Sequence, residues 1–87
     1  MYLHLGSDVV VSQRDIVAIL DLETTSISRI TREFLDRAQK SGMVIDVSDE
    51  LPKSYVVVGS GGKYKLYVSP MSPQTLTKRL NRNILVE

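Results

Sequence analysis

One apolar run decides the fold, Ile16-Val17-Ala18-Ile19-Leu20. It has neither the alternation of a half-exposed strand nor the spacing of an amphipathic helix, and it is rich in β-branched residues. Such a run is typical of a strand that is covered on both faces, by a helix on one side and by a second element on the other. In a chain of 87 residues, another subunit can supply that second cover. The run is far shorter than the roughly 20 apolar residues of a membrane-spanning helix.

Two shorter segments precede this run. Tyr2–Leu5 and Val9–Val11 are expected to be strands, because the turn residues Gly6-Ser7-Asp8 separate two stretches of strand-like sequence. They are either a pair of strands or one bent strand, and the sequence leaves both open.

The clearest helix lies downstream of the run, over residues 27–41. Its apolar residues recur with helical spacing, at Ile27, Ile30, Phe34, Leu35 and Ala38. Gly42 lies where a left-handed C-cap belongs, and a hydroxyl group from Thr25, Ser26 or Ser28 is expected to cap the N-terminus. Two i,i+4 ion pairs are expected on the outer side, Glu33–Arg37 and Asp36–Lys40.

The rest of the chain contains strands and a last helix. Met43–Val47 is expected to be a strand, and a hairpin follows a polar connector. The arms of the hairpin are Ser54–Val58 and Lys63–Ser69, joined by the loop Gly59–Gly62. Ser72-Pro73 begins the last helix, as a hydroxyl cap followed by proline. The predicted fold is a single α+β domain over residues 1–87, with a small curved antiparallel sheet, one main helix and a C-terminal helix.

The residue types argue against catalysis. The chain has no cysteine and a single histidine, His4, which lies on a short predicted strand. Its carboxylates lack the spacing of known metal sites. We therefore expect no enzyme activity, no cofactor, no metal and no small-molecule substrate. No signal peptide or membrane segment is expected either, so the predicted location is the cytoplasm.

The net charge of +1 conceals an uneven distribution. Residues 1–52 contain five basic and nine acidic side chains, which gives −4. Residues 53–86 contain six basic and no acidic side chains, which gives +6. Such a split indicates either a surface for a polyanion or a head-to-tail contact between copies. Lys63 and Lys65 share a predicted strand face with Tyr67, and Lys53 begins the preceding arm, so three cations and an aromatic ring are expected near one face.

Matches to a known family run in order along nearly the whole chain. The residues that carry them are Met1–Gly6, Val9–Val11, Ile16–Glu23, Ile30–Leu35, Gly42–Asp46, Pro52–Ser54, Ser69-Pro70 and Thr75–Arg79. In these residues the chain resembles the extracellular matrix regulatory proteins RemA and RemB, and the RemB branch above all. The resemblance implies a DNA-binding transcriptional regulator of biofilm matrix genes. It also implies a fold related to the LytTR DNA-binding domain and homo-oligomeric rings with a basic rim for wrapped DNA.

The resemblance also implies site residues. Arg14 matches an arginine before the central strand that is thought to contact DNA. The family's pair of arginines in the connector before the hairpin is absent here, where the sequence reads Glu50-Leu51-Pro52-Lys53. The predicted nucleic-acid-binding residues are Arg14, Lys53, Lys63, Lys65 and Arg79, in contact with the backbone of double-stranded DNA. The missing pair keeps an alternative open, an oligomeric interaction scaffold or a partner of a related regulator that does not bind DNA itself.

Overall fold

The computed structural model describes residues 1–22, 29–80 and 85–86. The expected capping residues 25, 26 and 28 and the expected helical residue 27 lie outside these ranges. The described part contains two sheets and two α-helices. The elements are β1 (Tyr2–Gly6), β2 (Val9–Ser12), the 3₁₀ turn η1 (Gln13–Asp15), β3 (Ile16–Asp21), α1 (Arg29–Lys40), β4 (Val44–Asp46), β5 (Ser54–Ser60), β6 (Lys63–Ser69), α2 (Pro73–Lys78) and β7 (Leu85–Val86).

The larger sheet has five strands in the order β4-β6-β5-β3-β7. Its central strands β6, β5 and β3 are antiparallel, but β4 pairs with β6 and β7 pairs with β3 in parallel. The prediction of an antiparallel sheet is therefore wrong at both edges. At the β4 edge, α1 lies between β3 and β4 in the chain, and β4 runs in the same direction as β3, as in a crossover connection. The expected α+β composition is confirmed.

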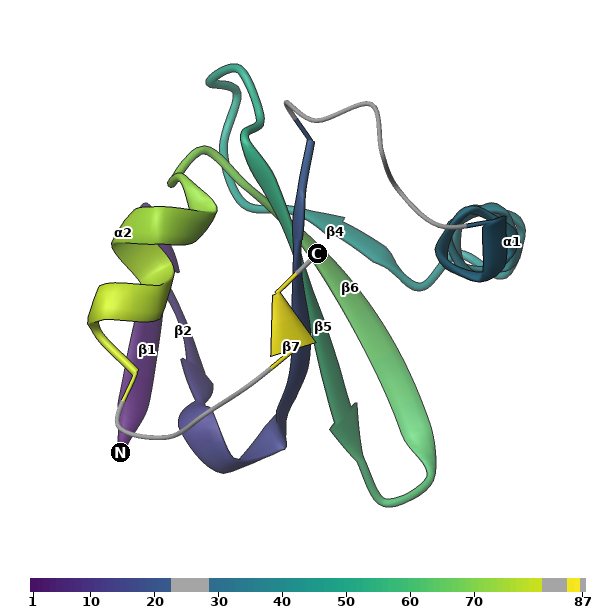
Figure 1. The fold of residues 1–87 in the computed structure, drawn as a ribbon, viewed down its shortest axis with the longest axis horizontal. Coiled ribbons are helices and arrows are strands. Elements are labelled where there is room, and N and C mark those ends of the chain that lie inside the picture. Colours follow the sequence, from purple (N-terminus) through teal and green to yellow (C-terminus); the bar gives the residue numbers. More distant parts are fainter. Residues whose placement is uncertain (23–28, 81–84, 87) are drawn as a thin grey trace.

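Both faces of β3 are covered, as its apolar sequence predicts (Figure 1). Ala18 and Leu20 pack against residues of α1 on one face. Ile16 and Ile19 belong to the cluster on the other face, where β1, β2 and α2 lie. A β-bulge at Val17 shifts the alternation between these two sets and leaves Val17 47% exposed. The second cover comes from this chain's own hairpin and last helix, so no other subunit is needed for it.

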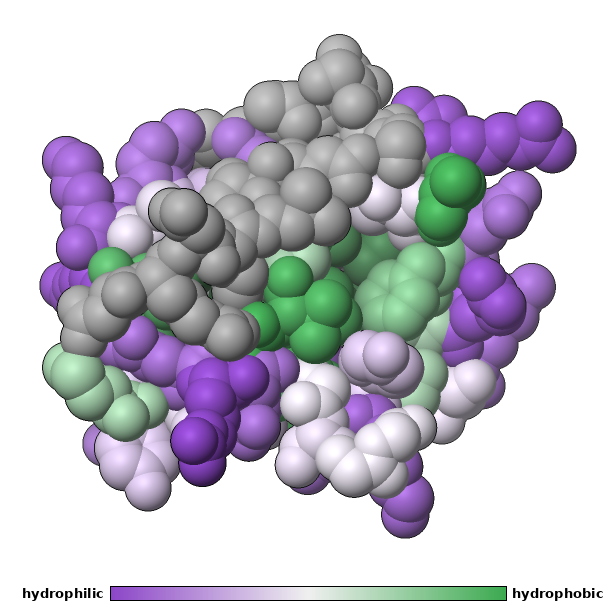
Figure 2. Space-filling model, turned by 60° about the horizontal axis from the view of Figure 1, so that its bottom comes forward, coloured by the Kyte–Doolittle hydropathy of each residue, from purple (hydrophilic) through white to green (hydrophobic). Residues whose placement is uncertain are grey.

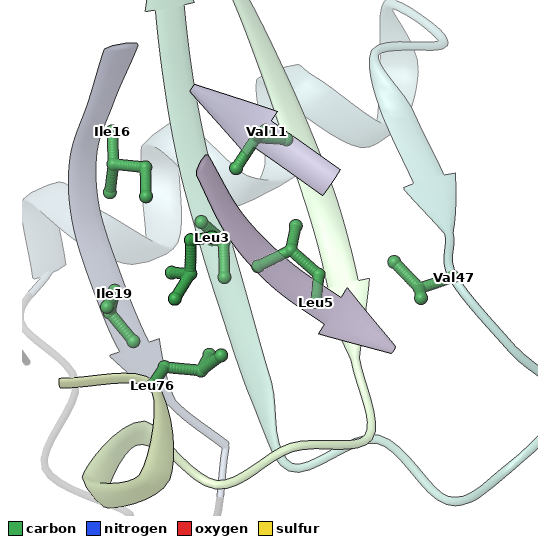
Figure 3. Packing of buried hydrophobic residues seen from close by; sticks show 8 residues of the cluster. Leu3, Leu5, Val11, Ile16, Ile19, Val47 and Leu76 are labelled. Atoms are coloured by element: carbon green, nitrogen blue, oxygen red, sulfur yellow. The ribbon is translucent and has the colours of Figure 1, made fainter. Parts of the chain in front are cut away.

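The core on the β1–β2 side joins the two sheets (Figure 3). Leu3 and Leu5 of β1 point into it, and Leu76 of α2 closes it from the side of the helix. The buried residues of this cluster are Leu3, Leu5, Val11, Ile16, Ile19, Val47, Val56 and Leu76. Because β1 and β2 pair in antiparallel register, they are two strands and not one bent strand.

The end of α1 is built as the sequence predicts. Gly42 has a φ of +71°, and the Met43 N–H donates to the Ala38 carbonyl at 3.1 Å. One residue of the predicted apolar face is instead exposed. Ile30 is 78% exposed, although its spacing assigns it to the apolar face.

The ion pairing on α1 also differs from the prediction. Among the described residues, Glu33 pairs with Arg29 at 3.4 Å. The expected pairs Glu33–Arg37 and Asp36–Lys40 are not formed there. An exposed ion pair stabilises a protein by less than about 1 kcal/mol, so such side chains are only weakly held together.

The β5–β6 hairpin is longer and its turn is tighter than expected. The strands pair continuously from Ser54 opposite Ser69 to Ser60 opposite Lys63. The turn consists of Gly61 and Gly62, with φ values of +59° and +79°. A two-residue turn of this kind needs positive φ at both positions, which glycine adopts without strain. Gly59 and Ser60 therefore belong to β5 and not to the loop.

The last helix begins as predicted. The Ser72 side chain caps α2 by accepting the Thr75 N–H at 3.2 Å, and Pro73 is the first helical residue. Leu76 is completely buried and Leu80 is half-buried. Neither described helix is long and apolar enough to cross a membrane.

Candidate nucleic-acid interface

Arg14 lies at the middle of η1, the turn between β2 and β3. The preceding Gln13 and the following Ile16 are buried, whereas the Arg14 side chain is exposed. The inward direction of Gln13 continues the alternation of Val9 and Val11 along β2. The buried Gln13 and Ile16 therefore anchor the turn, which directs the arginine to solvent.

Lys63 and Lys65 lie at the start of β6, close to the same turn. Together with Tyr67 they line an open cleft of about 350 Å³ between β2 and the β5–β6 hairpin. Asp15 of η1 and Ser60 of β5 line the same cleft. This confirms that the two lysines and the tyrosine share one face, and it places both lysines beside the turn that carries Arg14.

Arg79 follows the last residue of α2 and is exposed. Its carbonyl oxygen lies 3.4 Å from Nε2 of Gln13, so the end of the helix adjoins η1. Four exposed cations thus lie at one end of the molecule, the lower end in Figure 1, where η1, the β5–β6 turn and the end of α2 are found. We call this set the basic edge; it consists of Arg14, Lys63, Lys65 and Arg79.

Lys53 lies at the opposite end of the sheet. Its N–H donates to the Ser69 carbonyl at 2.9 Å, and its carbonyl accepts the Leu22 N–H at 3.1 Å. The six-residue step along β5 from Ser54 to Ser60 separates the two ends by about 20 Å. Lys53 therefore lies at the open end of the hairpin, whereas Lys63 and Lys65 lie near its turn.

The basic edge is not neutralised within the described residues. The ion pair in this part of the chain is Arg29–Glu33 on α1. Asp15 lies in the cleft with two lysines, yet no carboxylate of residues 1–22 or 29–80 comes within 4.0 Å of a cation of the edge. Such cations remain available to an external anion.

Figure 2 shows the molecule with its lower end turned forward. Hydrophilic side chains surround a hollow in which apolar residues gather. An apolar groove lies between α1 and β3, and its lining includes Val17, Ile30, Phe34 and Tyr64. The ring of Phe34 packs edge-on against Tyr64, with centroids 6.3 Å apart. Groove and basic edge are different surfaces, since none of the four cations lines the groove.

Catalytic and metal-binding groups do not gather in the described residues. No cluster of three or more His, Cys, Asp or Glu side chains is present in residues 1–22 and 29–80. His4 is exposed on β1, and its Nε2 lies within hydrogen-bond distance of the Ser7 carbonyl.

Gln13 is the residue of this region that the sequence prediction missed. Its role was visible in the alternation Val9, Val11, Gln13, which directs a long amide side chain inward immediately before Arg14. An amide at an inward position indicates a buried hydrogen-bonding role.

The described residues thus form a small α+β domain whose basic edge has no carboxylate partner among them. Comparison with known proteins identifies the particular family. Residues 2–80 match the RemA-like family, described as extracellular matrix regulatory protein A-like. The chain is 47% identical over 79 residues to extracellular matrix regulatory protein B of Bacillus subtilis, covering 91% of this chain and 89% of that protein. The chain belongs to the RemA-like family.

Proposed function

We propose that this protein is a non-enzymatic, cytoplasmic regulator of extracellular matrix genes that binds double-stranded DNA. The observation that carries the proposal is the basic edge, where four exposed cations have no carboxylate partner among the described residues. The name of the Bacillus subtilis relative supports the regulatory role in matrix production. The DNA-binding role in biofilm transcription and the kinship with the LytTR domain come from the family resemblance and belong to the proposal.

Contacts to the phosphate backbone explain the geometry better than reading of base edges. The four cations come from a turn, a strand and the end of a helix. That helix, α2, precedes Arg79 and has only 6 residues. Within the described residues, no single helix therefore presents a row of these four cations to a major groove. Positive charges arranged along one edge are suited to contacts with DNA phosphates. Such contacts position a protein on the duplex but do not read its base sequence. Four phosphate contacts would give a slope of log K against log salt of about −3 to −4.

The connector differs from the family pattern in a way that bears on DNA binding. In place of the arginine pair, this chain has the exposed residues Glu50, Leu51 and Pro52 before Lys53. Asp49 and Glu50 belong to the connector between β4 and β5, which ends with Lys53 at the end of the sheet opposite the basic edge. We propose that DNA contacts are concentrated on the basic edge, with Lys53 in reach of the same duplex only through another copy in a ring.

The same arrangement favours a second candidate function. An acidic connector at one end and a basic edge at the other can bring copies together head to tail, which is a heterologous contact that closes into rings. The protein would then be an oligomeric scaffold, or a partner of a related regulator, in which the basic edge is occupied by protein. Light scattering at low and high salt, with the ratio of absorbance at 260 and 280 nm, separates this candidate from DNA binding.

The test of DNA binding is a titration of labelled duplex with wild type and with two single-charge variants. Arg14→Ala is expected to weaken binding several-fold and to make the salt slope shallower by about one unit. Arg32→Ala is the matched control, because it removes an equal, exposed charge from α1 on the other side of the sheet. It is expected to change neither quantity. If wild type does not bind duplex even at about 50 mM salt, DNA binding is rejected.

A further inference from the structure

Gln13 is one of three buried polar residues in the described chain, and it lies at the junction of three elements. Its side chain is 6% exposed. Its N–H donates to the Met1 carbonyl at 2.9 Å. Its Nε2 amide group lies 3.4 Å from both the Tyr2 carbonyl of β1 and the Arg79 carbonyl after α2. An amide NH₂ group has two protons, so it can donate to both carbonyls at once.

The amide connects the two parts of the basic edge that carry arginines. Arg14 is the next residue in the chain, and Arg79 contributes the carbonyl to which the amide donates. Within the described residues, no backbone hydrogen bond joins η1 to α2. The Gln13 side chain is therefore a polar link between the turn and the end of the helix.

We propose that Gln13 is the positioning residue of the basic edge, and this inference rests on the proposed DNA binding. By holding the turn against the helix end, it fixes the separation of Arg14 and Arg79 before DNA arrives. Two cations that are already placed lose less conformational freedom on binding than two independent ones. A site of this kind depends on the residues that support it as well as on those that touch the ligand.

The test is a double-mutant cycle on DNA affinity with Gln13→Met. Methionine keeps the length and apolar body of the side chain and removes the amide, with both its N–H donors and its carbonyl acceptor. We expect Gln13→Met to weaken duplex binding about three- to tenfold in the wild-type background, which lies within the range of coupling between residues in contact. In a background that carries Arg14→Ala and Arg79→Ala, the same substitution is expected to change affinity very little. In the Lys53→Ala background, at the other end of the sheet, the full loss is expected.

The controls keep this inference separate from the function on which it rests. Thermal unfolding identifies a temperature at which every variant is folded, and affinities are compared there. If Gln13→Met does not fold, Gln13→Asn takes its place, since it keeps an amide that is too short by one methylene to reach both carbonyls. Absence of wild-type binding overturns the proposed function. Wild-type binding with an unchanged affinity for the Gln13 variant, or an equal loss in all backgrounds, overturns the positioning role alone.

Discussion

At the scale of single residues, Gly59 is a glycine because the ring of Tyr64 occupies the space where a Cβ atom would lie. Gly59 faces Tyr64 across the β5–β6 pair. A Cβ atom added at Gly59 would lie 2.8 Å from Cε1 of Tyr64 and 3.2 Å from Cγ2 of Val17. The backbone of Gly59 does not have a positive φ, so the requirement is one of space and not of conformation.

Gly59→Ala is therefore expected to destabilise the protein. Overpacking of this kind costs about 1–3 kcal/mol of unfolding free energy, measured by urea denaturation. In a Tyr64→Ala background the ring that would clash with the new Cβ atom is absent. Gly59→Ala is then expected to lower the unfolding free energy by clearly less. An equal cost in both backgrounds would show that the tyrosine ring is not the reason for the glycine.

Ser69 is a second residue with a specific role, because its hydroxyl group makes two hydrogen bonds. It is completely buried, and its hydroxyl donates to the Leu5 carbonyl at 2.6 Å and accepts the Met71 N–H at 3.1 Å. It thereby joins the small sheet to the large one and fixes the chain before α2. Ser54, its partner across the strands, donates to the Met71 carbonyl at 2.8 Å.

Ser69→Ala is expected to lower the unfolding free energy by about 1–3 kcal/mol, because the buried Leu5 carbonyl and the part-buried Met71 N–H lose the hydroxyl that bonds to them. Ser54→Ala removes one such bond and serves as the comparison, with a smaller expected loss. Chemical denaturation of both variants measures the difference. A larger loss for Ser54→Ala would contradict the assignment of Ser69 as the main link.

At the scale of elements, α2 is held by packing and not by its own length. A helix of 6 residues is too short to be stable alone, even with the Ser72 cap. Leu76, which has no exposed surface, anchors it in the core next to Leu3 and Ile19 (Figure 3). The position of Arg79 at the basic edge depends on this anchor.

Leu76→Ala is expected to cost about 2–5 kcal/mol of unfolding free energy, the range for large-to-small changes in a core. Gln74→Ala is the matched control on the exposed side of the same helix, with an expected change within about 0.5 kcal/mol. Thermal and urea unfolding of both variants test this. If Leu76→Ala unfolded like wild type, α2 would not be part of the cooperative core.

At the scale of the whole molecule, the separation of Lys53 from the basic edge makes a prediction about assembly. For one copy bound to DNA, Lys65→Ala is expected to make the salt slope shallower by about one unit, whereas Lys53→Ala leaves it unchanged. Titrations of duplex at several salt concentrations measure both slopes, and light scattering gives the number of copies. Equal effects of the two variants would indicate that neighbouring copies present both ends of the chain to one duplex.

The sequence by itself determined the local structure. The run Ile16–Leu20 predicted a strand covered on both faces, the helical spacing before Gly42 predicted α1, and Ser72-Pro73 predicted the start of α2; all three are confirmed. These features depend on residues that are close in the chain, where periodicity and capping chemistry act directly. Arg14, Lys63 and Lys65 were likewise identified as candidate residues from the sequence and its family resemblance.

Which of these residues lie together follows from the way the elements pack. The tertiary structure made the edges of the sheet parallel and brought Arg79 to the turn of Arg14 through the amide of Gln13. Strand pairing and the docking of α2 join residues that are far apart in the chain, such as Gln13 and Arg79. No local pattern encodes such pairs, because their contact depends on how all the buried faces pack at once.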